Sequence, residues 1–143
     1  MNKRILNAIM LASGSVALSV SASPFDGAQP LICASTEILE CIPGAGCNRV
    51  TAQSVDAPQF MRIDFDAKSI SSEWQGGGTR VSEIERSEVV DGKLMLQGAE
   101  DGIENVRDGL GWTLSIGQES GTMTLTGSGD AVGFVIFGAC TTM

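Results

Sequence analysis

The fold class of this chain is decided by residues 112–126, which read WTLSIGQESGTMTLT. In the first half of this stretch, three large apolar residues alternate with a threonine and a serine. The polar segment 118–121 then turns the chain, and in the second half three threonines alternate with Met123 and Leu125. A period of two is typical of a strand with one buried face, so the stretch predicts two antiparallel strands joined by a short turn.

The same alternation recurs along the chain, and no segment after residue 22 shows sustained helical periodicity. The strands that it predicts are residues 31–41, 47–53, 61–65, 70–74, 79–89, 93–98, 112–116, 122–126 and 131–138. In the fifth strand, Val81 and Val89 are the apolar members, and the turn Asp91-Gly92 follows it. Because short turns cannot make parallel crossovers, we expect an antiparallel meander.

Eight to nine such strands close most easily into a small barrel, which removes the exposed sheet edges. We therefore expect an all-β fold, a closed lipocalin-like or lysozyme-inhibitor-like barrel, with a two-sheet β-sandwich as the alternative. The side chains expected to face its core are Met61, Ile63, Phe65, Trp112, Leu114, Ile116 and Phe134.

The first 22 residues have the pattern of a secretory signal peptide. Lys3 and Arg4 precede an apolar run over residues 5–20, and Ala22 ends a small-residue exit. The run is too short for a membrane span, and no cysteine follows it closely enough for a lipid anchor. We expect residues 1–22 to be removed and residues 23–143 to form one β domain in the periplasm or outside the cell.

Four cysteines in an exported chain predict two disulfides. Cys41 and Cys47 would face each other across a hairpin between residues 31–41 and 47–53. Cys33 would lie eight residues along the same strand, roughly 27 Å away, whereas bonded cysteines have Cα atoms within about 7 Å. Cys33 is therefore expected to pair with Cys140, which ties the first strand to the last.

The composition excludes several classes of function. The net charge of −8 would become −10 on loss of Lys3 and Arg4, and such a chain repels nucleic-acid phosphates and anionic lipid. With no histidine, no tyrosine and no spare cysteine, the common nucleophilic, metal and thiol sites are missing. We expect no cofactor and no metal site. Carboxylate-only hydrolysis remains as an alternative, since seventeen acids supply many pairs by chance.

Two features are candidate binding sites. Trp74 and Trp112 could face a ligand at a barrel mouth, although core packing is the favoured interpretation of both. The longest connection, residues 99–110, carries Glu100, Asp101, Glu104 and Asp108. These carboxylates do not match the EF-hand spacing, so we interpret the segment as a solvated loop and, if a cationic partner exists, as its contact.

Short segments across residues 31–140 resemble a group of small exported proteobacterial proteins with no assigned activity. The segments that carry the resemblance are Leu31-Ile32-Cys33-Ala34, Glu40-Cys41, Gly46-Cys47, Pro58-Gln59-Phe60 and Phe137-Gly138-Ala139-Cys140. The architecture is also similar to periplasmic lysozyme inhibitors, which are small disulfide-bearing barrels that plug a cationic enzyme. The resemblance implies export and paired cysteines.

The sequence therefore predicts a non-enzymatic exported binding or interaction protein. The alternatives are a lipocalin-like carrier of a small apolar ligand, an inhibitor of a cationic enzyme such as lysozyme, and the carboxylate-only hydrolase.

Overall fold

A computed structural model describes residues 23–73, 76–102, 105–106 and 108–143. The signal peptide that we expect over residues 1–22 lies outside the described residues, as do two of the candidate site residues, Trp74 and Glu104. The strands are β1 (Leu31–Ile42), β2 (Gly46–Val50), β3 (Phe60–Asp64), β4 (Ser69–Glu73), β5 (Thr79–Glu83), β6 (Arg86–Val90), β7 (Lys93–Glu100), β8 (Leu110–Gly117), β9 (Thr122–Ser128) and β10 (Gly133–Thr142).

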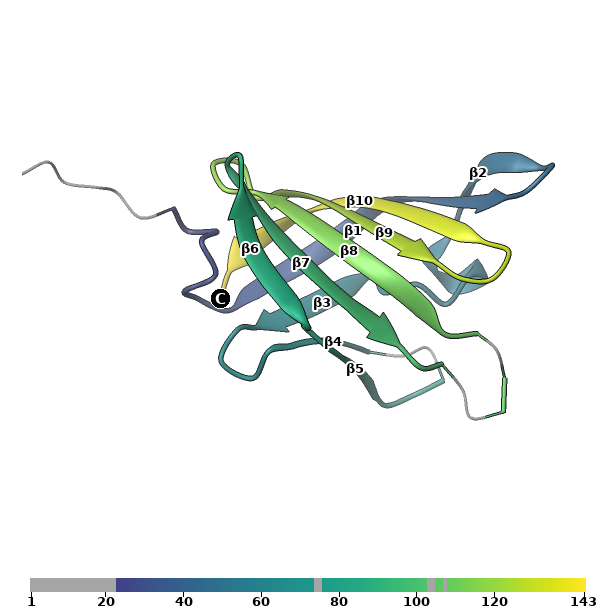
Figure 1. The fold of residues 1–143 in the computed structure, drawn as a ribbon, viewed down its shortest axis with the longest axis horizontal. Coiled ribbons are helices and arrows are strands. Elements are labelled where there is room, and N and C mark those ends of the chain that lie inside the picture. Colours follow the sequence, from purple (N-terminus) through teal and green to yellow (C-terminus); the bar gives the residue numbers. More distant parts are fainter. Residues whose placement is uncertain (1–22, 74–75, 103–104, 107) are drawn as a thin grey trace, which may run out of the picture.

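These strands form one antiparallel sheet in the order β5-β4-β3-β1-β10-β9-β8-β7-β6, and β2 pairs with β1 beside β3. Consecutive strands are paired neighbours except at two places: β2 and β3 both pair with the same edge of β1, and β5 and β6 lie at the two ends of the sheet. The sheet curls into an open half-barrel (Figure 1). The prediction of an all-β antiparallel meander is confirmed, and the opening lies between β5 and β6.

The centre of the sheet is the pairing of β1 with β10, as the predicted Cys33–Cys140 bridge requires. β1 is not a simple strand, because its register against β10 shifts between Ser35 and Glu37. Its other edge is shared by β3 and β2. The strand predicted over 47–53 is shorter than expected: β2 ends at Val50, and Ala52–Ser54 form a short 3-10 turn. The Thr51 hydroxyl caps this turn by accepting a hydrogen bond from the Ser54 N–H.

The single strand predicted over 79–89 is in fact two strands with a bend between them. At the bend, the Ile84 N–H donates to the carbonyl of Lys68 at 2.8 Å, and the Glu85 N–H donates to the carbonyl of Gln97 at 2.9 Å. The first half of the segment, β5, therefore pairs with β4 at one edge of the sheet, and the second half, β6, pairs with β7 at the opposite edge. Strands make the same change at the corner of a barrel. The two apolar members of the predicted strand, Val81 and Val89, are 62% and 51% exposed, whereas Ile84 at the bend is 5% exposed.

The concave side of the sheet is filled by one hydrophobic cluster. Five of the seven predicted core residues are buried there, and Phe65 and Phe134 are half-buried. The members of the cluster that are least exposed are Leu31, Cys33, Ile63, Leu94, Leu96, Leu114 and Ile116. Since these come from both halves of the sheet, the two halves bury their apolar faces against each other.

Gly98 on β7 allows this close approach, which gives a first prediction. A Cβ at Gly98 would lie 2.3 Å from the Glu83 carbonyl oxygen and 2.4 Å from the Trp112 ring. Since backbone and a buried ring cannot both move away, Gly98→Ala is expected to lower the free energy of unfolding by about 1–3 kcal/mol. Urea unfolding measures this. Gly111→Ala is the matched control, because a Cβ there has no described atom within 4 Å; equal effects of the two variants would contradict this packing.

Candidate functional site

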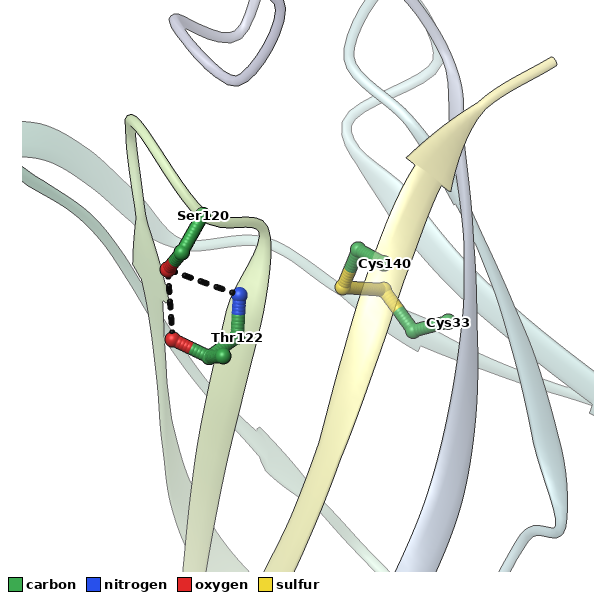
Figure 2. Close-up of a disulfide and its surroundings, with 4 residues drawn as sticks. All are labelled: Cys33, Ser120, Thr122 and Cys140. Carbon is green, nitrogen blue, oxygen red and sulfur yellow. Dashed lines mark hydrogen bonds between the residues drawn. A yellow bond between two sulfur atoms is a disulfide. The ribbon is translucent and has the colours of Figure 1, made fainter.

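Both predicted disulfides are present, Cys33–Cys140 and Cys41–Cys47. In each case the two cysteines lie directly opposite each other on neighbouring strands. This agrees with the pairing predicted from the distance between Cys33 and Cys41 along β1. Figure 2 shows the Cys33–Cys140 bridge between β1 and β10, with the Ser120–Thr122 turn nearby. No free cysteine remains in the described part of the chain. The bonded cysteines indicate an oxidising compartment and a structural role.

Trp112 is a core residue of β8 and is 6% exposed. Its indole N–H donates to the Ser82 hydroxyl at 2.8 Å, and that hydroxyl donates to the Ala99 carbonyl at 3.4 Å. This contact satisfies the polar atoms of both buried side chains and ties β5 to β8 across the interior. The favoured interpretation of Trp112 is confirmed, and its ring is enclosed by protein.

The acidic connection between β7 and β8 is shorter than predicted, because β7 extends to Glu100 and β8 begins at Leu110. Glu100 is therefore a strand residue, half-buried and directly opposite Leu110. The two sides of the connection lie close together: a Cβ at Gly102 would be 2.1 Å from Asp108 Oδ1. Asp101 and Asp108 are both exposed. Two of the four predicted carboxylates thus stand in an exposed narrow loop, and a third belongs to the sheet.

Arg80 on β5 connects this region to the segment that follows β2. Its guanidinium lies 3.0 Å from Asp56 Oδ2 and 3.9 Å from Glu100 Oε2. These side chains are between about a quarter and two fifths exposed, so the attraction is partly screened by water. The group fixes the end of the half-barrel at which β5, β7 and the 51–59 segment meet.

Further carboxylates gather at the same end. Asp130 lies in the β9–β10 turn, where a Cβ at Gly129 would be 3.7 Å from the Gly109 carbonyl. Glu73, at the end of β4, accepts a hydrogen bond from Thr79 at 3.5 Å. In Figure 1 the end of β4, the end of β7 and the β9–β10 turn lie on the right of the molecule. We call this region the acidic end; its described carboxylates are Asp56, Glu73, Glu100, Asp101, Asp108 and Asp130.

Only part of the acidic end could be predicted from the sequence. The run of acids after residue 99 was visible, but Asp56, Arg80 and Asp130 lie far from it in the chain. No local pattern marks Arg80 as inward-facing, because the bend at Ile84–Glu85 sets the direction of β5.

Two grooves are lined by described residues of the sheet. One, of about 340 Å³, runs along β6 and β7 between Arg86, Glu88, Val90 and Met95. The other, of about 290 Å³, lies at the edge of β1 between β2 and β3 and is lined partly by Ile38, Val50 and Phe60.

The interior of the described structure contains few polar side chains. Among the described residues, Ser82 is the buried polar side chain, and its hydroxyl is already hydrogen-bonded. The same residues contain no group of three or more histidine, cysteine or carboxylate side chains arranged to hold a metal ion. Within the described ranges, no helix is long and apolar enough to cross a membrane.

Comparison with known proteins found no matching family model, no matching curated protein and no matching solved structure.

Proposed function

We propose that this chain is an exported, non-enzymatic interaction protein that binds a cationic protein through its acidic end. The observation that carries the proposal is the gathering of six described carboxylates from four separate segments at one end of the half-barrel, with Arg80 among them. Clustered charge of one sign attracts a partner of the opposite sign and raises the rate of encounter. A cationic enzyme such as lysozyme is one partner of this kind.

The packing of the interior supports binding at the surface over the two rival functions. A carrier of an apolar ligand needs an apolar cavity between the strands, whereas this concave face is filled by its own side chains. A carboxylate hydrolase needs two close carboxylates in a cleft, one of them desolvated. The described carboxylates are half-buried or exposed, so water screens them.

Export is part of the proposal. The basic, apolar and small-residue order of residues 1–22 is that of a signal peptide. Two disulfides are common in proteins of oxidising compartments and rare in those of the cytosol. The resemblance to exported proteobacterial proteins is consistent with a periplasmic location.

The experiment is capture of partners from the exported fraction by immobilised residues 23–143, with lysozyme as a defined cationic probe. Three baits are compared: the wild type, an acidic-end variant (Asp101→Asn, Asp108→Asn, Asp130→Asn) and a matched variant at turns and a bend away from that end (Asp66→Asn, Glu85→Gln, Glu119→Gln). Asp56 and Glu100 are left intact because they pair with Arg80.

The expected result is a basic partner that salt elutes, that the wild type and the matched variant retain, and that the acidic-end variant loses. Because both variants change the net charge by the same amount, a general charge effect would weaken both equally. Equal retention by all three baits would contradict binding at the acidic end.

A further inference from the structure

The outer face of the sheet carries two unbroken rows of side chains that cross it from β1 to β6. The first row is Glu37, Phe137, Thr124, Ser115, Met95 and Glu88, each opposite the next on neighbouring strands. The second row is Leu39, Val135, Thr126, Thr113, Gln97 and Arg86, and Arg49 of β2 continues it beyond Leu39. Both rows face away from the core, because the row between them contains the buried Ile38, Ile136, Leu114 and Leu96.

This face carries no net charge, although the chain as a whole carries −8. The three adjacent strands β8, β9 and β10 contain no charged residue at all. The charges at the two margins are balanced by ion pairs, Arg49–Glu37 at 2.6 Å on one side and Arg86–Glu88 at 2.9 Å on the other. Lys93 at the β6–β7 turn is likewise paired with Asp91 at 3.3 Å. The excess of carboxylates therefore lies elsewhere, in large part at the acidic end.

The face carries an exposed aromatic side chain at one side and a groove at the other. Phe137 of β10 is 39% exposed at one side of the five-strand segment β10-β9-β8-β7-β6. The groove of about 340 Å³ lies at the other side, on β6 and β7, and includes Val90 and Met95. Figure 1 shows these five strands as one continuous layer with β8 in its middle. A two-fold axis that runs parallel to β8, in the plane between two copies, would place Phe137 of each copy over the groove of the other.

We infer that this outer face of β6–β10 is a self-association surface, whose partner is the same face of a second copy. A two-fold contact uses one patch twice and so needs a self-complementary surface. Like charges would oppose contact between two acidic ends, whereas this face brings none together. Two sheets pack face to face with their strands roughly aligned. The inference does not depend on the proposed function, because the two surfaces share no residue.

The contact is expected to be weak. Five strands about 4.8 Å apart give a patch roughly 20 Å wide, and the five residues of β6 at about 3.3 Å each make it roughly 17 Å long. Its area of roughly 350 Å² is less than half of the roughly 800 Å² that each partner buries in a standard interface. We therefore expect a dimer that forms at tens to hundreds of micromolar and coexists with monomer.

The test is sedimentation velocity of residues 23–143 from about 10 µM to about 1 mM. Ser115→Lys places a charge on β8, where it would face its own copy across the axis, and is expected to raise the dissociation constant at least tenfold. Phe137→Ala should raise it as well by removing the side chain that faces the groove. Ser115→Thr, which keeps the face neutral, and Val81→Lys, which adds the same charge on β5, should associate as the wild type does.

Circular dichroism and the urea midpoint establish that each variant is folded before it is compared. A wild type that stays monomeric over the whole range would overturn the inference. Association that survives Ser115→Lys unchanged, or that Val81→Lys abolishes, would overturn it equally, because either result places the contact on another surface.

Discussion

Replacing Cys33 and Cys140 together by alanine is expected to lower the free energy of unfolding by about 4.7 kcal/mol. The bridge joins residues 107 apart in sequence and so removes a large loop-closure entropy from the unfolded chain. It also ties together β1 and β10, through which the two halves of the sheet are connected. Urea unfolding of the oxidised variant, compared with the oxidised wild type, measures the difference.

The second bridge is the matched control for this result. Cys41–Cys47 spans six residues at a hairpin mouth, and the same loop argument gives about 2.4 kcal/mol for it. The double replacement of Cys41 and Cys47 is therefore expected to cost roughly half as much. If the two double variants lose equal stability, loop closure is not what the Cys33–Cys140 bridge contributes.

Leu114→Ala is expected to cost about 2–5 kcal/mol, because it removes a side chain that is 0% exposed and leaves a cavity in the middle of the core. Leu114 lies opposite Leu96 on β7 and Leu125 on β9, and neither strand can move in to fill the space without breaking its own pairing. The measurement is the urea midpoint at a concentration where the chain is monomeric.

The neighbouring residue provides the control. Thr113 faces outward on the same strand, and its hydroxyl accepts a hydrogen bond from Gln97 at 3.3 Å. Since that contact is exposed, Thr113→Ala is expected to cost less than about 1 kcal/mol. Comparable losses for Leu114→Ala and Thr113→Ala would show that the alternation along β8 does not separate a buried face from an exposed one.

The regular strands of this fold could be predicted from the sequence, because a side-chain period of two is a local property. β8 and β9 follow the alternation of residues 112–126 and the turn between them. The disulfide pairing was predictable for a related reason: a strand of known rise fixes how far Cys33 lies from Cys41, and that distance eliminates the wrong partners.

Features that depend on a bend within a strand, or on contacts between distant strands, could not be predicted from the sequence. The bend at Ile84–Glu85 shifts the alternation by one residue, because the inner face carries Ser82 of β5, opposite Ile70, but Val89 of β6, opposite Leu94. The buried Ile84 therefore does not stand out from a single alternation over residues 79–89. The register shift between Ser35 and Glu37 is a similar irregularity inside a continuous strand. Pairing between distant strands places Arg80 beside Asp56 and Glu100, and no local pattern reports such pairing.

The central claim is that the acidic end binds a cationic partner, and the association rate of the captured partner at low salt tests it most directly. Exposed charges act mainly on the rate of encounter, and their effect is lost beyond a Debye length. The acidic-end variant is expected to associate roughly tenfold more slowly than the wild type at low salt, and the difference should disappear at high salt. The matched variant with Asp66, Glu85 and Glu119 replaced should associate nearly as fast as the wild type. If the acidic-end variant associates as fast as the matched variant at low salt, the acidic end is not the binding site.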